Sequence, residues 1–296
     1  GRRLSQRDAA WGKNMKSGHD VSNRLVPRAF GDLRGWIEEL EREGELHTID
    51  AEVDWDCELG TIARKAFGNG DGPALRFRNI KGYGPNDDVW CREVFTGGMS
   101  NYSRVAMTLG LPKDASVRDL VLATRHYMQL RTPPVEVANG KVKQNIHRGD
   151  DIDLNKIPVP RWHREDGGRY INTYQATVTM DPDTGVHNLG IYRGMIGQKD
   201  TLPVLLWRAQ NWGVHFQKWE ERGQKMPVAH VYGWEPAMGF CASAPVPTIR
   251  TAPPRLSPDR SEVRNAIDLL RNSQRAMLMA GTSVMLSRMM SRELTT

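Results

Sequence analysis

The chain has 296 residues, of which 39% are hydrophobic and 26% charged, and its formal net charge is +6. This composition is ordinary for a folded globular protein, and it excludes disorder throughout the chain. There is no run of eighteen apolar residues, which excludes a membrane-spanning helix. Three widely spaced cysteines exclude a disulfide framework, so a cytoplasmic location is expected.

Residues 1–27 are basic and polar and lack the apolar segment of a secretory signal, so we expect a flexible start. The first regular element is a helix whose apolar residues recur at the spacing of one helix face: Leu33, Trp36, Ile37 and Leu40. Asp32 can cap the N-terminus of this helix. Gly44 can end it in the left-handed conformation.

Further segments complete a small α+β N-terminal domain, predicted over residues 28–130. Apolar and polar residues alternate from Leu75 to Ile80, which indicates a half-buried strand. The predicted elements are a strand at 46–49, a helix at 56–67, a half-buried strand at 75–80 and a helix at 114–129.

Strands dominate the central part of the chain, which is predicted to form one domain over residues 131–247. Asn139-Gly140 is a strong turn signal, so a hairpin is predicted from segments 135–137 and 141–145. The elements expected after the proline-rich stretch at 157–160 are strands at 170–180, 187–197 and 202–207, a helix at 212–222, a strand at 228–232 and a helix at 236–244.

The composition changes after Pro247. All nine Trp, seven Tyr and six Phe precede residues 248–296, where eight Arg against four acidic residues account for four of the six net charges. The preceding chain is therefore nearly neutral, and nucleic-acid binding is not expected. Two interpretations of this tail stay open: a Met-rich helix at about 261–290, or a divergent tail that follows a lost reading frame or a truncation.

The segment 187–193, HNLGIYR, combines an amide, a glycine and an arginine in a strand-like context. Asn188 can offer an amide oxygen to a hard cation, and Gly190 lets a large planar group approach the backbone. Arg193 presents a planar fork that suits a carboxylate or a phosphate. We therefore predict a site for an anionic ligand. The alternative is an edge-strand Asn and a surface Arg in an ion pair.

The longer stretch IPVPRWHREDGGRYINTYQATVTMDPDTGVHNLGIYRGMI, residues 157–196, resembles the central domain of the UbiD family of decarboxylases. The shared pattern is a proline-rich entry, a DGG turn, a strand, a DP-x-TG turn and then N-x-G-I-Y-R. The resemblance extends upstream to DLRGWIEELEREGEL and downstream to GWEPAMGFCASAPVP, and it covers about residues 28–247. It implies an α+β fold: a small α+β N-terminal domain plus a central split β-barrel of the flavin-reductase type, which binds FMN.

The resemblance also implies an activity. Members of the family use prenylated FMN for the non-oxidative, reversible decarboxylation of unsaturated or aromatic carboxylic acids. A divalent ion, usually Mn²⁺, together with K⁺ bridges the cofactor phosphate to the protein. The expected partners are a small carboxylic acid substrate, a flavin prenyltransferase that supplies the cofactor, and further copies of the chain in a homo-oligomer.

The resemblance assigns roles to single residues. Asn188 matches a metal ligand, and Arg193 matches the arginine that faces the substrate carboxylate, so Arg193 is the expected catalytic residue. The full set of expected cofactor contacts is Asn188, Ile191, Tyr192, Arg193, Trp207, Arg208, Ala242, Ser243, Ala244 and Pro245.

The sequence departs from the family pattern at two places. Gln210, within one residue, takes the position of a His metal ligand, and we expect it in the metal site as a neutral ligand, with His215 as the alternative. The family has a Glu metal ligand soon after Pro247 and an acidic proton donor farther on, whereas here no Glu lies between Pro247 and Glu262. The alternative function is therefore a truncated, inactive or binding-only relative without the catalytic carboxylate.

Overall fold

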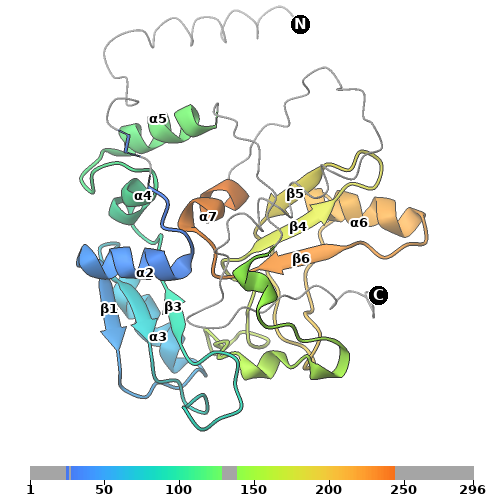
Figure 1. Ribbon diagram of the computed structural model, residues 1–296, viewed down its shortest axis with the longest axis horizontal. Helices are drawn as coiled ribbons and strands as arrows, with labels where there is room; N and C mark the ends of the chain where they lie inside the picture. The colour runs from blue at the N-terminus through green and yellow to red at the C-terminus, as the bar shows by residue number, and fades with distance from the viewer. Residues whose placement is uncertain (1–24, 27, 129–138, 244–296) are drawn as a thin grey trace, which may run out of the picture.

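The computed structural model describes residues 25–26, 28–128 and 139–243, and these build two three-stranded sheets (Figure 1). The first sheet has the order β1-β2-β3, formed by β1 (Leu46–Ile49), β2 (Ala74–Phe77) and β3 (Val94–Thr96). Strands β1 and β2 are parallel, whereas β3 is antiparallel to β2. Because parallel neighbours need a crossover connection, helix α3 (Glu58–Phe67) lies between β1 and β2 in the chain.

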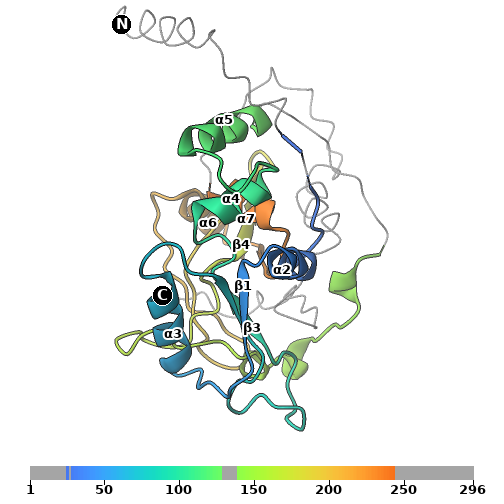
Figure 2. The same ribbon diagram turned by 90° about the vertical axis from the view of Figure 1, so that its left-hand side faces the viewer.

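Helices cover both faces of the first sheet because successive residues of β2 point to opposite sides. Ala74 packs with Trp36 and Leu40 of helix α2 (Leu33–Arg42). Leu75 and Phe77 pack instead against the apolar residues of α3. Figure 2 shows α2 and α3 on opposite sides of β1. The N-terminal part therefore has its core on both sides of a small sheet.

Both ends of α2 lie where the sequence predicts them. The Asp32 carboxylate accepts hydrogen bonds from the amides of Arg34 and Gly35 at 2.9 and 3.3 Å. Gly44 has a φ of 71°, the left-handed conformation that glycine adopts without strain. The predicted cap and the predicted stop are thus confirmed.

Helices α4 (Tyr102–Thr108) and α5 (Val117–Tyr127) form a separate apolar cluster. A capping box between Ser116 and Asp119 starts α5, so the helix begins three residues later than Asp114, the predicted start. Neither α4 nor the short strand β3 was predicted, because segments of seven and three residues carry too little periodicity.

The second sheet has the order β5-β4-β6 and is antiparallel throughout. Its strands are β4 (Ala176–Met180), β5 (His187–Gly190) and β6 (Val228–Val231). Helix α7 (Pro236–Ser243) packs on the face of Ala176, and α6 (Asn211–Glu221) places His215 against Thr179 on the other face. The central strand β4 is consequently buried on both sides.

Several predicted strands are shorter in the structure. The strand predicted at 170–180 begins at Ala176, and the one predicted at 187–197 ends at Gly190. In place of a strand at 202–207, isolated bridges join Gly194 to Asn172 and to Val204. The glycines and prolines of this region interrupt the ladder.

The predicted strand at 141–145 is wrong. Residues Lys141–Lys143 form a 3₁₀ helix, followed by two more at Gly149–Asp151 and Leu154–Lys156. No residue of the first of these helices is buried, so the segment has no apolar face to place on a sheet. The other half of the predicted hairpin, at 135–137, lies outside the described residues.

The α+β class is confirmed, while the split β-barrel and the domain boundary near residue 130 stay predictions. Helix α7 links the two parts: Phe240 packs in the α4–α5 cluster, while Met238 and Ala242 pack against the second sheet. The predictions for 1–24 and 248–296 fall outside the described residues. Within the described ranges, no helix has the length and apolar character needed to cross a bilayer.

Candidate active site

Only the first four residues of the HNLGIYR segment, His187–Gly190, belong to the second sheet. Strand β5 ends at Gly190, and the next three residues, Ile191, Tyr192 and Arg193, line one cavity of about 660 Å³. A Cβ at Gly190 would lie 2.7–2.8 Å from atoms of the Tyr192 ring. The planar group that the glycine admits is therefore the side chain of Tyr192 itself, which folds back over the strand end.

This cavity, called the polar cavity below, lies between the two parts of the chain. Thr96 comes from the end of β3, and the remaining lining residues come from the central part. Three segments supply most of the central wall: the loop with Trp162, His163 and Asp166, the approach to β4 with Asn172, Thr173 and Tyr174, and the loop after β5. Gln210 closes one side at the start of α6.

A cluster of amides and rings holds the strand end next to the polar cavity. The Asn188 amide donates to the Tyr192 hydroxyl at 2.9 Å, and the Asn211 amide donates to Asn188 Oδ1 at 3.0 Å. The Tyr192 ring stacks on Trp212, with centroids 4.1 Å apart and planes at 7°. Because Trp212 is buried in α6, these contacts fix the loop to a rigid element.

Arg193 is exposed, and it makes no hydrogen bond or ion pair with the described part of the chain. Asp166 is the acidic side chain among the lining residues described. Its carboxylate accepts from the His163 amide at 3.0 Å and lies 3.5 Å from His163 Nδ1. The arginine fork thus stays available to an anionic ligand.

The loop that carries His163 and Asp166 is anchored to the N-terminal part. Arg161 binds Asp56 in a bidentate pair at 2.5 and 3.0 Å, and this guanidinium holds the pKa of the Asp56 carboxyl below its ordinary value. A Cβ at Gly60 would lie 1.9 Å from the Trp162 carbonyl oxygen. Helix α3 therefore packs directly on the backbone of this loop.

A buried polar network supports the wall formed by Asn172. The hydroxyl of buried Tyr232 donates to Asn172 Oδ1, which leaves the Asn172 amide to donate to His230 Nδ1 at 3.4 Å. The Thr177 hydroxyl lies 2.9 Å from the same nitrogen. Desolvation lowers the pKa of His230 to about 4 and raises the pKa of Tyr232. His230 is therefore neutral at pH 7, as an acceptor at Nδ1 requires.

Gln175 extends this network to the loop after β5. It is fully buried, and its amide donates to Thr177 Oγ1 at 3.1 Å and to the Tyr192 carbonyl at 2.5 Å. Its Oε1 has no hydrogen-bond partner among the described residues. The backbone next to Arg193 is thus tied to the second sheet through one side chain.

Of the expected cofactor residues that the structure describes, three line the polar cavity, and five do not: Asn188, Trp207, Arg208, Ala242 and Ser243. Trp207 and Arg208 are exposed, and neither lines the cavity. The Arg208 guanidinium is 3.5 Å from Glu220 of α6. Ala242 is buried in α7 against Trp234, while the Ser243 hydroxyl donates to the Gly239 carbonyl at 2.8 Å. Ala244 and Pro245 lie outside the described residues.

His215 lies away from the polar cavity. It is buried under the second sheet, where its Nδ1 is 2.9 Å from Thr179 Oγ1, and desolvation lowers its pKa. Asn211, which the sequence analysis did not consider, is the α6 residue that contacts Asn188. An Asn at the first position of a helix has an ordinary structural explanation, so the sequence carried no signal for that contact.

Asn172, Thr173 and Tyr174 are further wall residues that the sequence analysis did not name. They precede β4 in a stretch that was predicted to be strand, and only its polar character hinted at a site. The Tyr174 ring packs edge-on against Trp234 with centroids 5.9 Å apart, and desolvation raises the pKa of its hydroxyl to about 12, although the residue as a whole is 45% exposed. Tyr174 is therefore a neutral, rigid wall residue at pH 7.

The polar cavity fits a flavin better than the described side chains fit a metal ion. Its volume of about 660 Å³ lies within the usual range for cofactor sites. The described residues contain no group of three or more His, Cys, Asp or Glu side chains that could hold a metal. Near Asn188 the available oxygens belong to neutral amides, and Asn188 Oδ1 already accepts from Asn211.

Two family models match the chain, one over its N-terminal part and one over its central part. The family model of the 3-octaprenyl-4-hydroxybenzoate carboxy-lyase N-terminal domain matches residues 37–124. The model of the Rift-related domain of the same carboxy-lyase matches residues 134–251. The two models together account for more than half of the chain.

Several relatives of the chain are named as decarboxylases. The chain is 31% identical to pyrrole-2-carboxylic acid decarboxylase of Pseudomonas aeruginosa over 223 residues, which are 74% of this chain and 45% of that protein. It is 32% identical to ferulic acid decarboxylase 1 of Candida dubliniensis, over 73% of this chain and 44% of that protein. The chain thus spans less than half the length of these relatives.

Solved structures show the same fold. Vanillic acid decarboxylase of Sedimentibacter hydroxybenzoicus in its closed form superposes with a TM-score of 0.68 at 29% identity, covering 74% of this chain and 46% of the other. A UbiD-class enzyme of Pelotomaculum thermopropionicum in complex with FMN gives a TM-score of 0.57 at 29% identity, covering 70% and 43%. With both of its domain models matched in chain order, the protein belongs to the UbiD family.

Proposed function

We propose that the chain is a carboxy-lyase that removes CO₂, reversibly and without net oxidation, from an unsaturated or aromatic carboxylic acid. The observation that carries this proposal is Arg193, whose guanidinium lines the polar cavity without a partner in the described chain. A free guanidinium in a cavity binds a carboxylate through two parallel hydrogen bonds. Relatives named for decarboxylation of pyrrole-2-carboxylic, ferulic and phenolic acids support the substrate class.

Prenylated FMN is the proposed cofactor. One related UbiD-class structure contains FMN, and an evolved form of the same enzyme contains prenylated FMN. When bound, this flavin supplies the electron sink that loss of CO₂ requires. The residues proposed to hold it are Ile191, Tyr192 and Arg193, which line the polar cavity, together with the segment 242–245.

In this proposal the chain orients the acid and shapes its surroundings. Arg193 binds the carboxylate, and Trp162 and Tyr174 give the cavity apolar walls that limit access of water. The stacked Tyr192, which is fixed to α6 by Trp212, keeps the arginine-bearing loop in one position. Orientation of this kind lowers the entropic part of the barrier.

The proposed metal site is incomplete in the described chain. Asn188 and Gln210, together with Asn211, offer neutral amide oxygens, whereas Mn²⁺ sites usually include carboxylates. We propose that ligands for Mn²⁺ and K⁺ come from outside the described residues. A homo-oligomer and a flavin prenyltransferase as cofactor supplier remain part of the proposal.

A binding-only relative is the second candidate function. The observation that favours it is the scarcity of acid groups in the polar cavity, where Asp166 is held by the His163 amide. A chain of this kind would hold the flavin without returning a proton to the carbon that loses CO₂.

The test is purification of the chain after co-expression with a flavin prenyltransferase, followed by an absorption spectrum, metal analysis and assay of CO₂ release from a panel of aromatic and acrylic acids. We expect bound flavin, and release of CO₂ that falls more than about 100-fold in Arg193→Ala, because oriented binding is lost. Arg78→Ala, which removes an exposed arginine just after β2, is the matched control and should leave the flavin content and the release of CO₂ unchanged. Flavin without CO₂ release from any acid would favour the binding-only relative, and absence of flavin would contradict both candidates.

A further inference from the structure

The backbone is fixed on both sides of Arg193, although the residue itself is exposed. The carbonyl of the preceding Tyr192 accepts a hydrogen bond from the Gln175 amide at 2.5 Å. On the other side the Asn172 N–H donates to the Gly194 carbonyl at 3.0 Å, and the Gly194 N–H donates to the Asn172 carbonyl at 3.4 Å. The stretch before β4 therefore holds both neighbours of the arginine, whose side chain remains available in the polar cavity.

The surroundings of Gln175 determine the orientation of its amide. The Nε2 atom donates to two oxygens, the Tyr192 carbonyl and Thr177 Oγ1. Turning the amide round would place Oε1 against the Tyr192 carbonyl, and two acceptors repel each other. In the observed orientation Oε1 is buried and has no partner among the described residues. Because an unsatisfied buried oxygen costs free energy, stability alone does not explain an amide at this position.

The second hydrogen bond of the amide connects the arginine loop to the buried network around His230. Since Thr177 Oγ1 accepts from Gln175, its hydroxyl hydrogen is free to donate to His230 Nδ1 at 2.9 Å. The Asn172 side chain donates to the same nitrogen at 3.4 Å, and the Asn172 backbone pairs with the residue after Arg193. The hydrogen bonds thus form a closed circuit from one side of Arg193 to the other.

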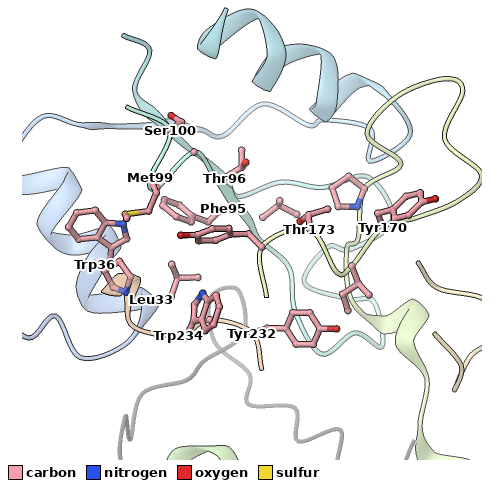
Figure 3. A pocket seen from close by; sticks show the side chains of 18 of the residues that line it. Leu33, Trp36, Phe95, Thr96, Met99, Ser100, Tyr170, Thr173, Tyr232 and Trp234 are labelled. Atoms are coloured by element: carbon pink, nitrogen blue, oxygen red, sulfur yellow. The ribbon is translucent and has the colours of Figure 1, made fainter. Parts of the chain in front are cut away.

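Gln175 is a wall residue of neither cavity described in the chain. It does not line the polar cavity, and it does not line a second cavity of about 430 Å³, which Figure 3 shows with Thr173 and Tyr232 in its wall. A ligand in the polar cavity therefore meets Arg193 and not Gln175. Any effect of this amide on such a ligand has to pass through the loop that carries the arginine.

We propose that Gln175 is a positioning residue of the carboxylate site. By holding the Tyr192 carbonyl, it sets the direction in which the Arg193 side chain leaves the backbone and meets the carboxylate. A bidentate pair between a guanidinium and a carboxylate requires a defined orientation of the two planes. The inference rests on the proposed function for the role of Arg193, and it adds a residue that acts on the acid only through that arginine.

The test compares the binding of benzoate with that of benzamide, a neutral molecule of the same shape, to the full 296-residue chain. We expect the unmodified chain to bind benzoate at least about tenfold more tightly, because Arg193 forms an ion pair only with the anion. In Arg193→Ala and in Gln175→Met this preference should fall to less than about twofold. Methionine keeps the unbranched shape of glutamine and removes the donor, and a general change of the cavity would affect both probes alike.

A double-mutant cycle separates positioning of Arg193 from a general effect on the fold. If Gln175 acts through Arg193, adding Gln175→Met to Arg193→Ala should leave benzoate affinity unchanged within about twofold. Thr179→Val is the matched control, because it removes another buried contact of 2.9 Å, to His215 away from the polar cavity. Urea unfolding should show a folded chain for this control, and its preference for benzoate should be that of the unmodified chain.

A second substitution guards against a loss of folding in Gln175→Met. Gln175→Asn keeps a buried amide that is shorter by one methylene and cannot reach both Thr177 and the Tyr192 carbonyl. The same loss of preference is therefore expected in this variant. A preference for benzoate that survives in either Gln175 variant, or a loss that adds in full to the loss in Arg193→Ala, would overturn the proposal.

Failure of this inference can be told apart from failure of the proposed function. A preference that is lost in Arg193→Ala and kept in the Gln175 variants would refute the positioning role and leave the carboxylate site standing. A preference that is lost in all of these variants, without release of CO₂ from any acid, would support the positioning role and refute decarboxylation. Equal binding of benzoate and benzamide to the unmodified chain would overturn both.

Discussion

Tyr192 stacks in parallel on Trp212, with ring centroids 4.1 Å apart. Tyr192 belongs to the loop that carries Arg193, and Trp212 is buried in the first turn of α6. The same tyrosine covers Gly190 with its ring and accepts a hydrogen bond from Asn188. The loop of the expected catalytic arginine is thus positioned by a ring contact and a polar contact together.

Substitution of Gly190 by alanine should disturb this loop more than it disturbs the fold. The added Cβ would lie 2.7 Å from the Tyr192 ring and force it off Trp212. We expect a loss of about 1–3 kcal/mol in unfolding free energy and loss of flavin retention, measured by urea titration and by absorption of the purified protein. Gly44→Ala is the control, because it strains a left-handed residue with nothing within 4 Å. If Gly190→Ala keeps its flavin as well as Gly44→Ala does, the ring is not needed for the cofactor site.

Stability should fall on acidification because of His230. Desolvation lowers the pKa of this histidine in the folded chain to about 4, below the ordinary 6.5, so the unfolded state binds the extra proton first as pH falls. The stabilisation is complete above pH 6.5 and is lost between about pH 6.5 and pH 4. Lowering the pH from 7 to 5 should cost on the order of 1–2 kcal/mol for this residue.

The measurement is urea unfolding of the chain and of His230→Gln at both pH values. Burial also lowers the pKa values of His187 and His215, so the variant should keep part of the pH dependence and lose the share of His230. An identical pH dependence in the two proteins would show that His230 is not the neutral acceptor of the network.

Two arginine–glutamate pairs should differ sharply in their contribution to the unfolding free energy. Arg104 is fully buried and binds Glu45 at 3.0 Å, the Gly72 carbonyl at 2.8 Å and Ser100 at 2.6 Å. Arg104→Ala should cost about 3–5 kcal/mol, because it leaves these partners unsatisfied in the interior. Arg28, half exposed in its pair with Glu39, should cost less than about 1 kcal/mol when changed to alanine. Urea unfolding measures the loss of unfolding free energy in each variant. Equal losses in Arg104→Ala and Arg28→Ala would contradict the argument from burial.

The contact between α3 and the loop 161–168 can be tested with two alanines in the same segment. A Cβ at Gly60 would lie 1.9 Å from the Trp162 carbonyl oxygen, so Gly60→Ala should separate helix and loop at a cost of about 1–3 kcal/mol. At Gly68 the nearest atom would be 3.3 Å away and the backbone is helical, so Gly68→Ala should be neutral or mildly stabilising. Thermal unfolding distinguishes the two variants. An unchanged stability of Gly60→Ala would show that the loop 161–168 can move away from α3 at little cost.

Much of the fold could be predicted from local signals. The cap at Asp32, the glycine stop at Gly44 and the helix at 212–222 were confirmed because each depends on nearby residues alone. The strand at 141–145 failed because its turn signal, Asn139-Gly140, is local while strand pairing is not. The strand predicted at 187–197 ends at Gly190, where the Tyr192 ring folds back over the strand end, and no periodicity could reveal the position of that ring.

The candidate site likewise contains residues that a local motif marks and residues that only packing brings together. Arg193, Ile191 and Tyr192 line the polar cavity, as the motif suggested, since a short segment carries all three. Asn211 contacts Asn188 and Trp212 contacts Tyr192, each across about twenty residues of sequence, and only the packing of α6 on the second sheet brings these pairs together. The cavity between α2, β3 and the segment that joins β6 to α7 draws Trp36 and Trp234 from opposite ends of the described chain, so no local sequence pattern marked it.

The two threonines of β4 specify how that strand must pair. Thr177 and Thr179 each meet a histidine nitrogen at 2.9 Å, on the face opposite Ala176. A slip of one residue would turn both hydroxyls toward the apolar side of α7 and leave the His215 and His230 nitrogens facing alanine and valine. A strand covered on both faces would otherwise offer several similar alignments to a folding chain. The two hydroxyls therefore disfavour a wrong register of β4, because it would leave four buried polar groups without hydrogen-bond partners.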